Sequence, residues 1–317
     1  MRAAVLGYGN QGAAQSFCLR ASGWDVTVGA RPGRSAERAR AAGFPVLPVA
    51  EAAAAAEFVA FLLPDEVLLQ ALPAGLASQL ARGATAVFAH GFALVSAGVQ
   101  WPAHADVVLV SPTAPGAVLE AEYRAGRGVP AYLAVAQDAS GEALERARRY
   151  ATAIGSARAR LLEVDLGEEV VADHFGEQTV LVGGLLELTA AAVDTLVRHG
   201  YPPALAYLEC AHQVRYLAEL LQTRGAAGFL AGVSATARFG ALTRGPRVIG
   251  PESRAALEAI LQEIRSGAFA REFLADRAAG GEGLERLSRE GLTGRFAALE
   301  AARQAALGPS EGSGESG

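Results

Sequence analysis

The feature that most constrains the fold of this chain is a glycine-rich turn close to its first residue. Gly7, Gly9 and Gly12 form a G-x-G-x-x-G pattern directly after the apolar run "AAVL" and directly before a helical stretch. In such a strand–turn–helix unit, the first glycine allows the tight turn and the second lets a phosphate approach the backbone. The third lets the helix pack on the strand, and the amino end of the helix faces the pyrophosphate. The pattern predicts a dinucleotide-binding fold.

The first half of the chain continues this strand–helix alternation as far as about residue 165. Each β-branched run in it is continuously apolar, which is typical of parallel strands covered by helices on both faces. We therefore predict an α/β fold whose N-terminal domain, residues 1–165, is a doubly wound Rossmann sheet. The runs that predict strands are "AAVLG", "DVTVGAR", "FVAFLLP", "TAVFAHG", "DVVLVSP" and "AYLAVA".

From residue 166 the sequence pattern becomes helical throughout. Apolar residues recur at three- and four-residue spacing in three long stretches, beginning at "VVADHFGEQ", "PPALAYLEC" and "SRAALEAIL". Pro202 and Pro203 restart the chain after Gly200, as expected where one helix ends and another begins. We predict an all-helical domain over residues 166–307. The glycine- and serine-rich segment 308–317 predicts a disordered tail.

Composition excludes several classes of partner. The formal net charge of −5 provides no basic face for nucleic acid or an anionic membrane. The apolar stretch "EAAAAAEFVAFLLPDE" is interrupted by charge and proline, so we expect no membrane-spanning helix.

Cys18 and Cys210 lie far apart with no metal-type spacing, which favours buried core thiols and a reducing, cytoplasmic location. Because Met1 leads directly into a predicted strand, we expect no signal peptide.

The end of the second predicted strand indicates which dinucleotide binds. An acid at this place would bind both ribose hydroxyls of NAD, but the segment "GARPGRS" contains Arg31, Arg34 and Ser35, and the first acid is Glu37. Guanidinium groups bind phosphate well. The segment favours NADP(H) over NAD(H); a solvated basic loop is the alternative.

Carboxylates of the helical half form a candidate metal site. Asp173 and Glu177 are four residues apart and share one helical face, as do Glu209 and Gln213. Oxygen ligands without clustered thiolates suit a hard cation such as Mg²⁺. The alternative is ordinary surface charge on amphipathic helices.

Several motifs distributed over both halves resemble one enzyme family. From Met1 to about Arg303 the chain resembles ketol-acid reductoisomerases of the short, class I type. The resemblance implies an NADPH- and Mg²⁺-dependent isomeroreductase of branched-chain amino-acid biosynthesis, with a C-terminal domain of the 6-phosphogluconate dehydrogenase type. It further implies a homodimer whose interlocked helical domains share each site, acting on a small 2-acetohydroxy acid. The motifs are "GYGNQG", "LLPDEV", "FAHGF", "EYRAGRGVPAYLAVAQDASG", "DHFGEQTVLVGGLLEL", "ALAYLECAH", "VSATARFG" and "TRGPRVI".

The resemblance assigns roles to individual residues. Asp173 would bridge two metal ions, Glu177 would bind the first and Glu209 the second. Ser234 would hold the substrate carboxylate, and His90 would lie beside nicotinamide and substrate. The implied cofactor contacts are Gly7, Tyr8, Gly9, Asn10, Gln11, Gly12, Leu63 and Pro64, together with Arg31, Arg34, Ser35 and His90.

The resemblance fails at several polar positions. Thr113 stands where the family has a lysine, and Gln213 where it has a second glutamate. Losing the lysine removes a proton donor near the migrating centre, and an amide weakens cation binding relative to a carboxylate. Other departures are Ala93 for asparagine, Ala235 for asparagine or aspartate, Arg238 for an acid and His174 for an apolar residue. The two alanines predict a roomier, more apolar pocket.

Three functions are compatible with these residues. The first is an NADPH-dependent reductase of a small 2-keto acid, imine or related carbonyl compound, in specialised metabolism, with doubtful alkyl migration. The second is a genuine ketol-acid reductoisomerase, and the third a catalytically silent nucleotide-binding homologue. Thr113 and Gln213 separate the first two, while the intact glycine turn and the retained acids argue against the third.

Overall fold

The computed structural model of the chain describes residues 1–308 and divides into two compact units, Met1–Ala172 and the part from Asp173 onward. The boundary falls inside helix α8, Leu166–Gly176, whose first turns belong to the first unit. Of the predicted tail, residues 309–317 lie outside the described part of the chain.

The first unit is an eight-stranded sheet with the order β3-β2-β1-β4-β5-β6-β7-β8. All neighbouring strands are parallel except β6 and β7. The fold class predicted from the sequence is therefore confirmed, and all six predicted runs contain a strand. The strands are β1 Arg2–Leu6, β2 Asp25–Gly29, β3 Val46–Leu47, β4 Phe58–Phe61, β5 Thr85–Phe88, β6 Asp106–Pro112, β7 Ala131–Gln137 and β8 Leu161–Glu163.

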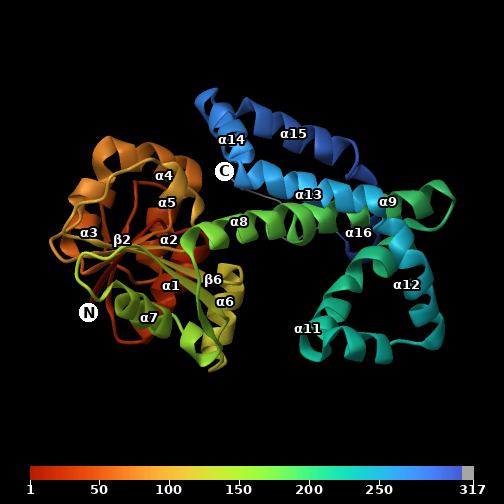
Figure 1. Ribbon diagram of the computed structural model, residues 1–317, viewed down its shortest axis with the longest axis horizontal. Coiled ribbons are helices and arrows are strands. Elements are labelled where there is room, and N and C mark those ends of the chain that lie inside the picture. Colours follow the sequence, from red (N-terminus) through yellow and green to blue (C-terminus); the bar gives the residue numbers. More distant parts are fainter. Residues whose placement is uncertain (309–317) are drawn as a thin grey trace. The chain divides into compact units, whose positions relative to one another are not determined.

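Helices cover both faces of this sheet, α1, α2, α6 and α7 on one and α3, α4 and α5 on the other (Figure 1). Alternate strand residues enter the two cores: Val5 packs with the first set of helices, whereas Leu6 packs with the second. This two-sided burial explains the continuous apolar runs. The helices are α1 Asn10–Ala21, α2 Arg34–Ala41, α3 Val49–Ala55, α4 Asp65–Ala71, α5 Phe92–Ser96, α6 Gly116–Arg124 and α7 Ala143–Ala153.

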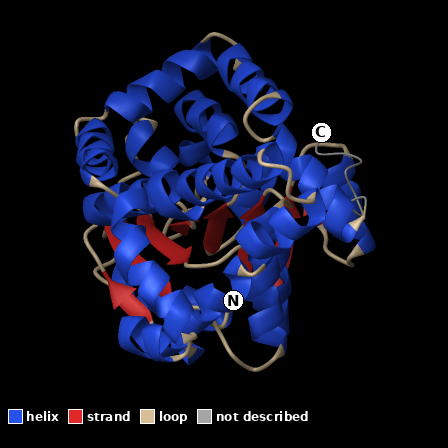
Figure 2. Cartoon of the chain, turned by 90° about the vertical axis from the view of Figure 1, so that its right-hand side faces the viewer, coloured by secondary structure: helices blue, strands red, loops and turns tan. Residues whose placement is uncertain are grey.

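Beyond Glu163 the described chain contains helices and no strand, and the strands of Figure 2 all belong to the first unit. Gly225 and Gly267 have positive φ angles; Gly225 forms a kink inside a helix, and Gly267 divides the last long predicted stretch into two helices. The helices are α9 Gly183–Arg198, α10 Pro203–Tyr207, α11 Val214–Ala231, α12 Ala235–Val248, α13 Pro251–Arg265, α14 Ala268–Ala278, α15 Glu282–Thr293 and α16 Ala297–Leu307. Two π-helical turns, η4 Glu177–Leu181 and η5 Leu208–His212, interrupt the helical path.

The core of the second unit is small. Its buried apolar cluster among the described residues consists of Val193, Ala206 and Ala302, with a few half-buried neighbours. Many large apolar side chains stay exposed on its helices, including Leu181 at 65% and Phe239 at 65%. A unit of this size normally buries far more apolar surface.

The helical segment Leu166–Arg198 is long and apolar enough to cross a membrane by length and composition, with a mean hydropathy of 1.8 over its best window. The expectation that no stretch reaches this length was wrong. That expectation rested on an alanine-rich run of the first half, and this segment was predicted only as an amphipathic helix. One such helix is weak grounds for a membrane location, since helices that pack against other protein pass the same test.

Candidate active site

The glycine turn lies where the order of the strands reverses. Strand β1 has β2 on one side and β4 on the other, so the chain crosses the sheet in opposite directions from this point. Ligands of open α/β sheets bind at such a switch point, outside the carboxyl ends of the strands. Gly7 has a φ of +98°, and a Cβ there would lie 2.7 Å from the carbonyl oxygen of Leu62, after β4. The two turns therefore touch at the mouth of the crevice.

The amino end of helix α1 is shaped to receive a phosphate. Gly9 caps the helix without a side-chain hydrogen bond, and the first turn contains no acid. A Cβ on Gly9 would meet no atom within 4 Å, whereas a Cβ on Gly12 would lie 2.3 Å from the carbonyl oxygen of Gly7. Gly9 thus leaves open space for a ligand, while Gly12 is required by packing. This cradle fits a dinucleotide pyrophosphate.

The other residues of "GYGNQG" are occupied by contacts within the protein. The Tyr8 ring is buried and packs against Phe44, and burial raises the pKa of its hydroxyl. Gln11 Nε2 donates to the carbonyl oxygen of Ala114 at 2.9 Å. A Cβ on Gly116 would lie 2.2 Å from the carbonyl oxygen of Asn10. The turn before α6 is therefore held directly on the start of α1.

The predicted phosphate-binding arginines lie after strand β2. Arg31, Arg34 and Ser35 are all exposed, and Arg34 is the first residue of helix α2. Gly33, at the cap of this helix, has a φ of 137° and makes no side-chain cap. The loop contains no carboxylate before Glu37 in the first turn of α2, so its charge favours an anion.

His90 follows strand β5, next to the segment that follows β4. Its Nδ1 lies 3.2 Å from Oδ2 of Asp65, the first residue of α4. A Cβ on the next residue, Gly91, would lie 2.3 Å from Cγ2 of Val170 in helix α8. The backbone beside His90 is therefore packed tightly against α8.

Thr113 stands at the position of the missing lysine. Its hydroxyl donates to the carbonyl oxygen of Pro130 at 3.0 Å, and its backbone N–H donates to the same oxygen at 2.9 Å. The side chain thus ties the turn after β6 to the start of β7. A hydroxyl held in this way does not replace a lysine ammonium as a proton donor.

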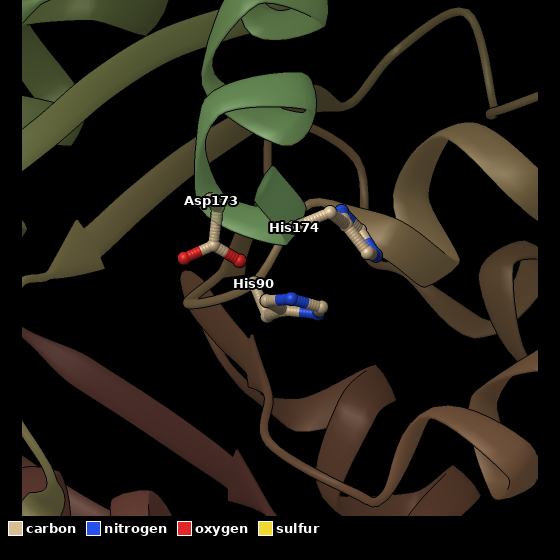
Figure 3. Close-up of side chains that lie close together, drawn as sticks. All are labelled: His90, Asp173 and His174. Carbon is tan, nitrogen blue, oxygen red and sulfur yellow. The ribbon is translucent and has the colours of Figure 1, made fainter. Parts of the chain in front are cut away.

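The end of helix α8 carries Asp173 and His174, which project in different directions (Figure 3). Neighbouring positions of a helix are about 100° apart, so the sequence correctly separated their faces. His174 is buried, and its ring packs edge-on against Phe269. The atoms that His90, Asp173 and His174 could offer to a metal lie within 4.8 Å of one another.

Both of the remaining predicted acids lie on π-helical turns. Glu177 begins η4 and Glu209 lies in η5. Such turns often mark functional sites. The turn η4 is followed by two glycines whose Cβ atoms would lie 2.2 and 1.9 Å from the carbonyl oxygens of Gln178 and Thr179. Only glycine therefore fits at Gly183 and Gly184.

Glu209, Gln213 and Ser234 of the second unit are exposed in the single chain. Gln213 Nε2 donates to Oε2 of Glu209 at 3.0 Å. Ser234 caps helix α12 and accepts a hydrogen bond from the backbone N–H of Ala237 at 3.1 Å. Within the described chain, the group of candidate metal ligands contains neither Glu177 nor Glu209. The acids are present, but the chain by itself does not assemble them.

Two features of this site were not predicted from the sequence. Asp65 stood in the quoted motif "LLPDEV", yet its pairing with His90 depends on the order of β4 and β5. Ala93, which the sequence placed in the pocket, is fully buried in the core behind the sheet. The expected widening of the pocket at Ala93 was wrong, since this side chain is fully buried within a core cluster.

Comparison with known proteins decides the family. Residues 1–160 match the family model described as acetohydroxy acid isomeroreductase, NADPH-binding domain, and residues 166–305 match that described as ketol-acid reductoisomerase, C-terminal domain. The chain belongs to the ketol-acid reductoisomerase family. A solved NADH-preferring ketol-acid reductoisomerase from an uncultured archean is 35% identical, with a TM-score of 0.90 over 97% of this chain and 95% of that one.

More distant structures share only the fold. A semialdehyde dehydrogenase NAD-binding protein from Cupriavidus necator is 18% identical, with a TM-score of 0.62 over 84% of this chain and 98% of that one. A 1-pyrroline-5-carboxylate reductase from Streptococcus pyogenes is 15% identical, with a TM-score of 0.55 over 84% and 98%. As a member of the ketol-acid reductoisomerase family, the chain is an NAD(P)-dependent oxidoreductase that binds a nicotinamide dinucleotide.

Proposed function

We propose that this protein is an NADPH-dependent reductase of a small 2-keto acid, imine or related carbonyl compound, in which alkyl migration is weak or lost. The observation that carries the proposal is the use of Thr113. Its hydroxyl and its backbone N–H both donate to one carbonyl oxygen, that of Pro130, so nothing at this position replaces the lysine of the family. The cradle at Gly7, Gly9 and Gly12 is intact, so hydride transfer keeps its framework.

A second candidate is a genuine ketol-acid reductoisomerase with unusual polar residues. It is favoured by the 35% identity to a ketol-acid reductoisomerase over nearly the whole chain. The retained acids Asp173, Glu177 and Glu209 are also those that the family resemblance assigns to metal binding. The two candidates differ in one step, the migration that precedes reduction.

We infer a preference for NADPH over NADH from the loop after β2. Arg31 and Arg34 provide two guanidinium groups, and the loop contains no carboxylate before Glu37 that would repel a 2′-phosphate. The 35%-identical relative is NADH-preferring, so a comparison of NADPH with NADH tests this preference. We expect Arg31→Ala to lower kcat/KM for NADPH about 10-fold and to leave that for NADH within about twofold.

We infer that Asp173 and Glu177 hold a divalent cation, Mg²⁺ in the first instance. Their oxygen donors fit a hard cation, and the bound ion would polarise the substrate carbonyl. Glu209 would complete the shell with one carboxylate where the family has two, because Gln213 offers an amide that donates to it. The donor set therefore fits one ion better than two.

We infer that the protein acts as a homodimer in the cytoplasm. The small buried cluster of the second unit and the many leucines and valines exposed on its helices support a second copy that covers them. A second copy would cover this surface and would bring its own Glu209 to the site. Burial raises the pKa of the Cys18 thiol to about 12, and both cysteines are free thiols. A reducing compartment agrees with these thiols.

The residues of the chain then have separate tasks in the reduction. The nicotinamide supplies the hydride when bound. Ser234 keeps its hydroxyl proton available for the substrate carboxylate, because its oxygen serves as the acceptor for Ala237 N–H. His90 gives a proton to the oxygen of the reduced carbonyl. Packing of Gly91 on Val170 keeps the backbone beside His90 fixed.

The test follows NADPH oxidation with two substrates in the presence of Mg²⁺. One is 2-acetolactate, which requires migration, and the other is its isomerised product, 3-hydroxy-3-methyl-2-ketobutyrate. We expect turnover of the second alone. Comparable turnover of both would establish the genuine reductoisomerase, and no turnover of any keto acid or imine would refute the proposal.

A matched variant tests the role of Thr113 itself. Thr113→Val keeps the branched shape and removes the hydroxyl that donates to Pro130. We expect reduction to stay within about twofold. A loss of about 10-fold or more would mean that the hydroxyl takes part in proton transfer.

A further inference from the structure

Three hydrogen bonds made by side chains connect helix α7 to the turn that follows β6. The Tyr150 hydroxyl donates to Oε1 of Gln15 at 2.8 Å, and Nε2 of Gln15 donates to Oε1 of Gln11 at 3.0 Å. Nε2 of Gln11 then donates to the carbonyl oxygen of Ala114 at 2.9 Å. We call Tyr150, Gln15 and Gln11 the side-chain relay. It ends on a residue that is 103 positions from Gln11 in sequence.

The inner part of the relay is closed to water. Gln15 and Tyr150 have no solvent exposure, and Tyr150 lies in the core cluster beneath α1, α6 and α7. Gln11 and Gln15 are four residues apart, so their side chains lie on one face of α1. A buried polar group that loses its partner cannot bind water instead. The orientation of each side chain therefore depends on its neighbour in the relay.

The carbonyl group at the end of the relay fixes its direction. A carbonyl oxygen only accepts, so Gln11 must turn its NH₂ group toward Ala114 and its Oε1 toward Gln15. Gln15 must then turn its own NH₂ group toward Gln11, which leaves its Oε1 for the hydroxyl of Tyr150. Hydrogen bonds in such a chain polarise one another. Gln15 is therefore the group that keeps the Gln11 amide facing the turn.

The turn at the end of the relay borders the dinucleotide crevice. It follows the carboxyl end of β6, and ligands of open α/β sheets bind outside these strand ends. A Cβ on Gly116 would lie 2.2 Å from the carbonyl oxygen of Asn10, the first residue of α1. On its other side the turn is tied by Thr113 to the start of β7. Gln11 thus holds the turn beside the cradle to which Gly9 belongs.

We propose that Gln15 is a positioning residue of the dinucleotide site. Through Gln11 it holds the turn after β6 against the amino end of α1 before the dinucleotide binds. A site that is already ordered loses less conformational freedom on binding, so it binds its ligand more tightly. This role depends on dinucleotide binding alone and applies whichever carbonyl compound is reduced.

The test compares Gln15→Met with Tyr150→Phe in the full chain. Gln15→Met keeps the length of the side chain and removes both of its hydrogen bonds. Tyr150→Phe removes only the outer bond and leaves the bonds of Gln11 to Gln15 and to Ala114 in place. Both variants lose a buried hydrogen bond, so both should lower Tm. Tyr150→Phe therefore shows what lost stability alone does to dinucleotide binding.

NADPH and NADH are titrated separately by fluorescence. We expect Gln15→Met to raise both dissociation constants about 10-fold, and Tyr150→Phe to leave both within about twofold. In the absence of dinucleotide, hydrogen exchange of the backbone amides of residues 113–118 should be at least about 10-fold faster in Gln15→Met than in Tyr150→Phe. Equal dissociation constants for the two variants, equal exchange of these amides, or weaker binding of NADPH alone would overturn the assignment.

A double-mutant cycle tests whether Gln15 acts through Gln11. Gln11→Met removes the bond to Ala114 directly and should weaken binding of both dinucleotides at least as much as Gln15→Met. The double variant should then bind them no more weakly than Gln11→Met alone, because residues that act in series have non-additive effects. If the two effects multiply, Gln15 acts by another route, and the proposal is wrong.

Gln11→Met also keeps the proposal testable if Gln15→Met does not fold, since Gln11 is only half-buried. The deciding measurement is then the exchange of the amides of residues 113–118 without dinucleotide. Exchange at least about 10-fold faster than in the wild type would support the relay. Exchange at the wild-type rate would show that the Gln11 side chain does not hold the turn and would refute the proposal.

Discussion

A buried hydrogen bond behind the dinucleotide turn offers a stability test of the first unit. Tyr150 donates its hydroxyl to Oε1 of Gln15 at 2.8 Å, and both side chains have no solvent exposure. Gln15 in turn donates to Gln11, whose amide holds the carbonyl oxygen of Ala114. The tyrosine therefore supports the helix that carries the phosphate cradle.

Tyr150→Phe removes the donor and leaves the amide oxygen of Gln15 buried. Such a loss costs about 1–3 kcal/mol. For a unit of this size each kcal/mol lowers Tm by about 2–4 °C, so a loss of about 2 kcal/mol lowers Tm by about 4–8 °C. Differential scanning calorimetry of the full chain measures this shift.

Tyr123→Phe is the matched control for this experiment. The Tyr123 hydroxyl lies 2.7 Å from Oγ of Ser22 at the surface, where water replaces the lost bond. We expect its Tm to stay within about 1 °C of the wild type. Equal shifts for the two variants, or none for Tyr150→Phe, would refute the idea that burial decides the cost.

Three further predictions concern binding. Gly9→Ala should keep the wild-type Tm, because its Cβ meets only open space, and should weaken NADPH binding at least about 10-fold in a fluorescence titration, whereas Gly12→Ala should also lose stability. NADPH binding by Gly9→Ala as tight as that of the wild type would contradict the phosphate cradle. The double variant Thr113→Lys with Gln213→Glu should bind Mg²⁺ about 10-fold more tightly in calorimetry, since a carboxylate replaces an amide. The new lysine would be the only one in the chain. An unchanged Mg²⁺ titration would contradict the placement of the metal site. Gly184→Ala should weaken Mg²⁺ binding, because its Cβ would lie 1.9 Å from the carbonyl oxygen of Thr179 and would disturb the π-helical turn that carries Glu177. Gly240→Ala is the control, since nothing lies within 4 Å of its Cβ, and it should leave Mg²⁺ binding unchanged. Equal effects of the two variants on Mg²⁺ binding would refute a role of this turn in metal binding.

Much of the first unit could be predicted from sequence because its signals are local. The glycine spacing and the six apolar runs predict the sheet and its switch point, and each run contains a strand. Strands β3 and β8 were missed because they have only two and three residues. The reversed direction of β7 was missed because an apolar run has the same pattern in either direction.

The candidate site was less predictable because its parts meet through tertiary contacts. The sequence places Asp173 and Glu177 one turn apart, but a π-helical turn begins at Glu177 and shifts the register of the helix after it. Asp65 and His90 meet only because β4 and β5 are neighbours. Ala93 was predicted as a pocket residue and is a core residue in the fold, since α5 turns it inward.

The central claim is that this chain reduces a keto acid without first moving an alkyl group. The most direct measurement is the ratio of kcat/KM for 3-hydroxy-3-methyl-2-ketobutyrate to that for 2-acetolactate, with NADPH and Mg²⁺. We predict a ratio of about 100 or more, because losing a positioned proton donor costs about that much in rate. A ratio near one would show that migration proceeds without the lysine and would contradict the account.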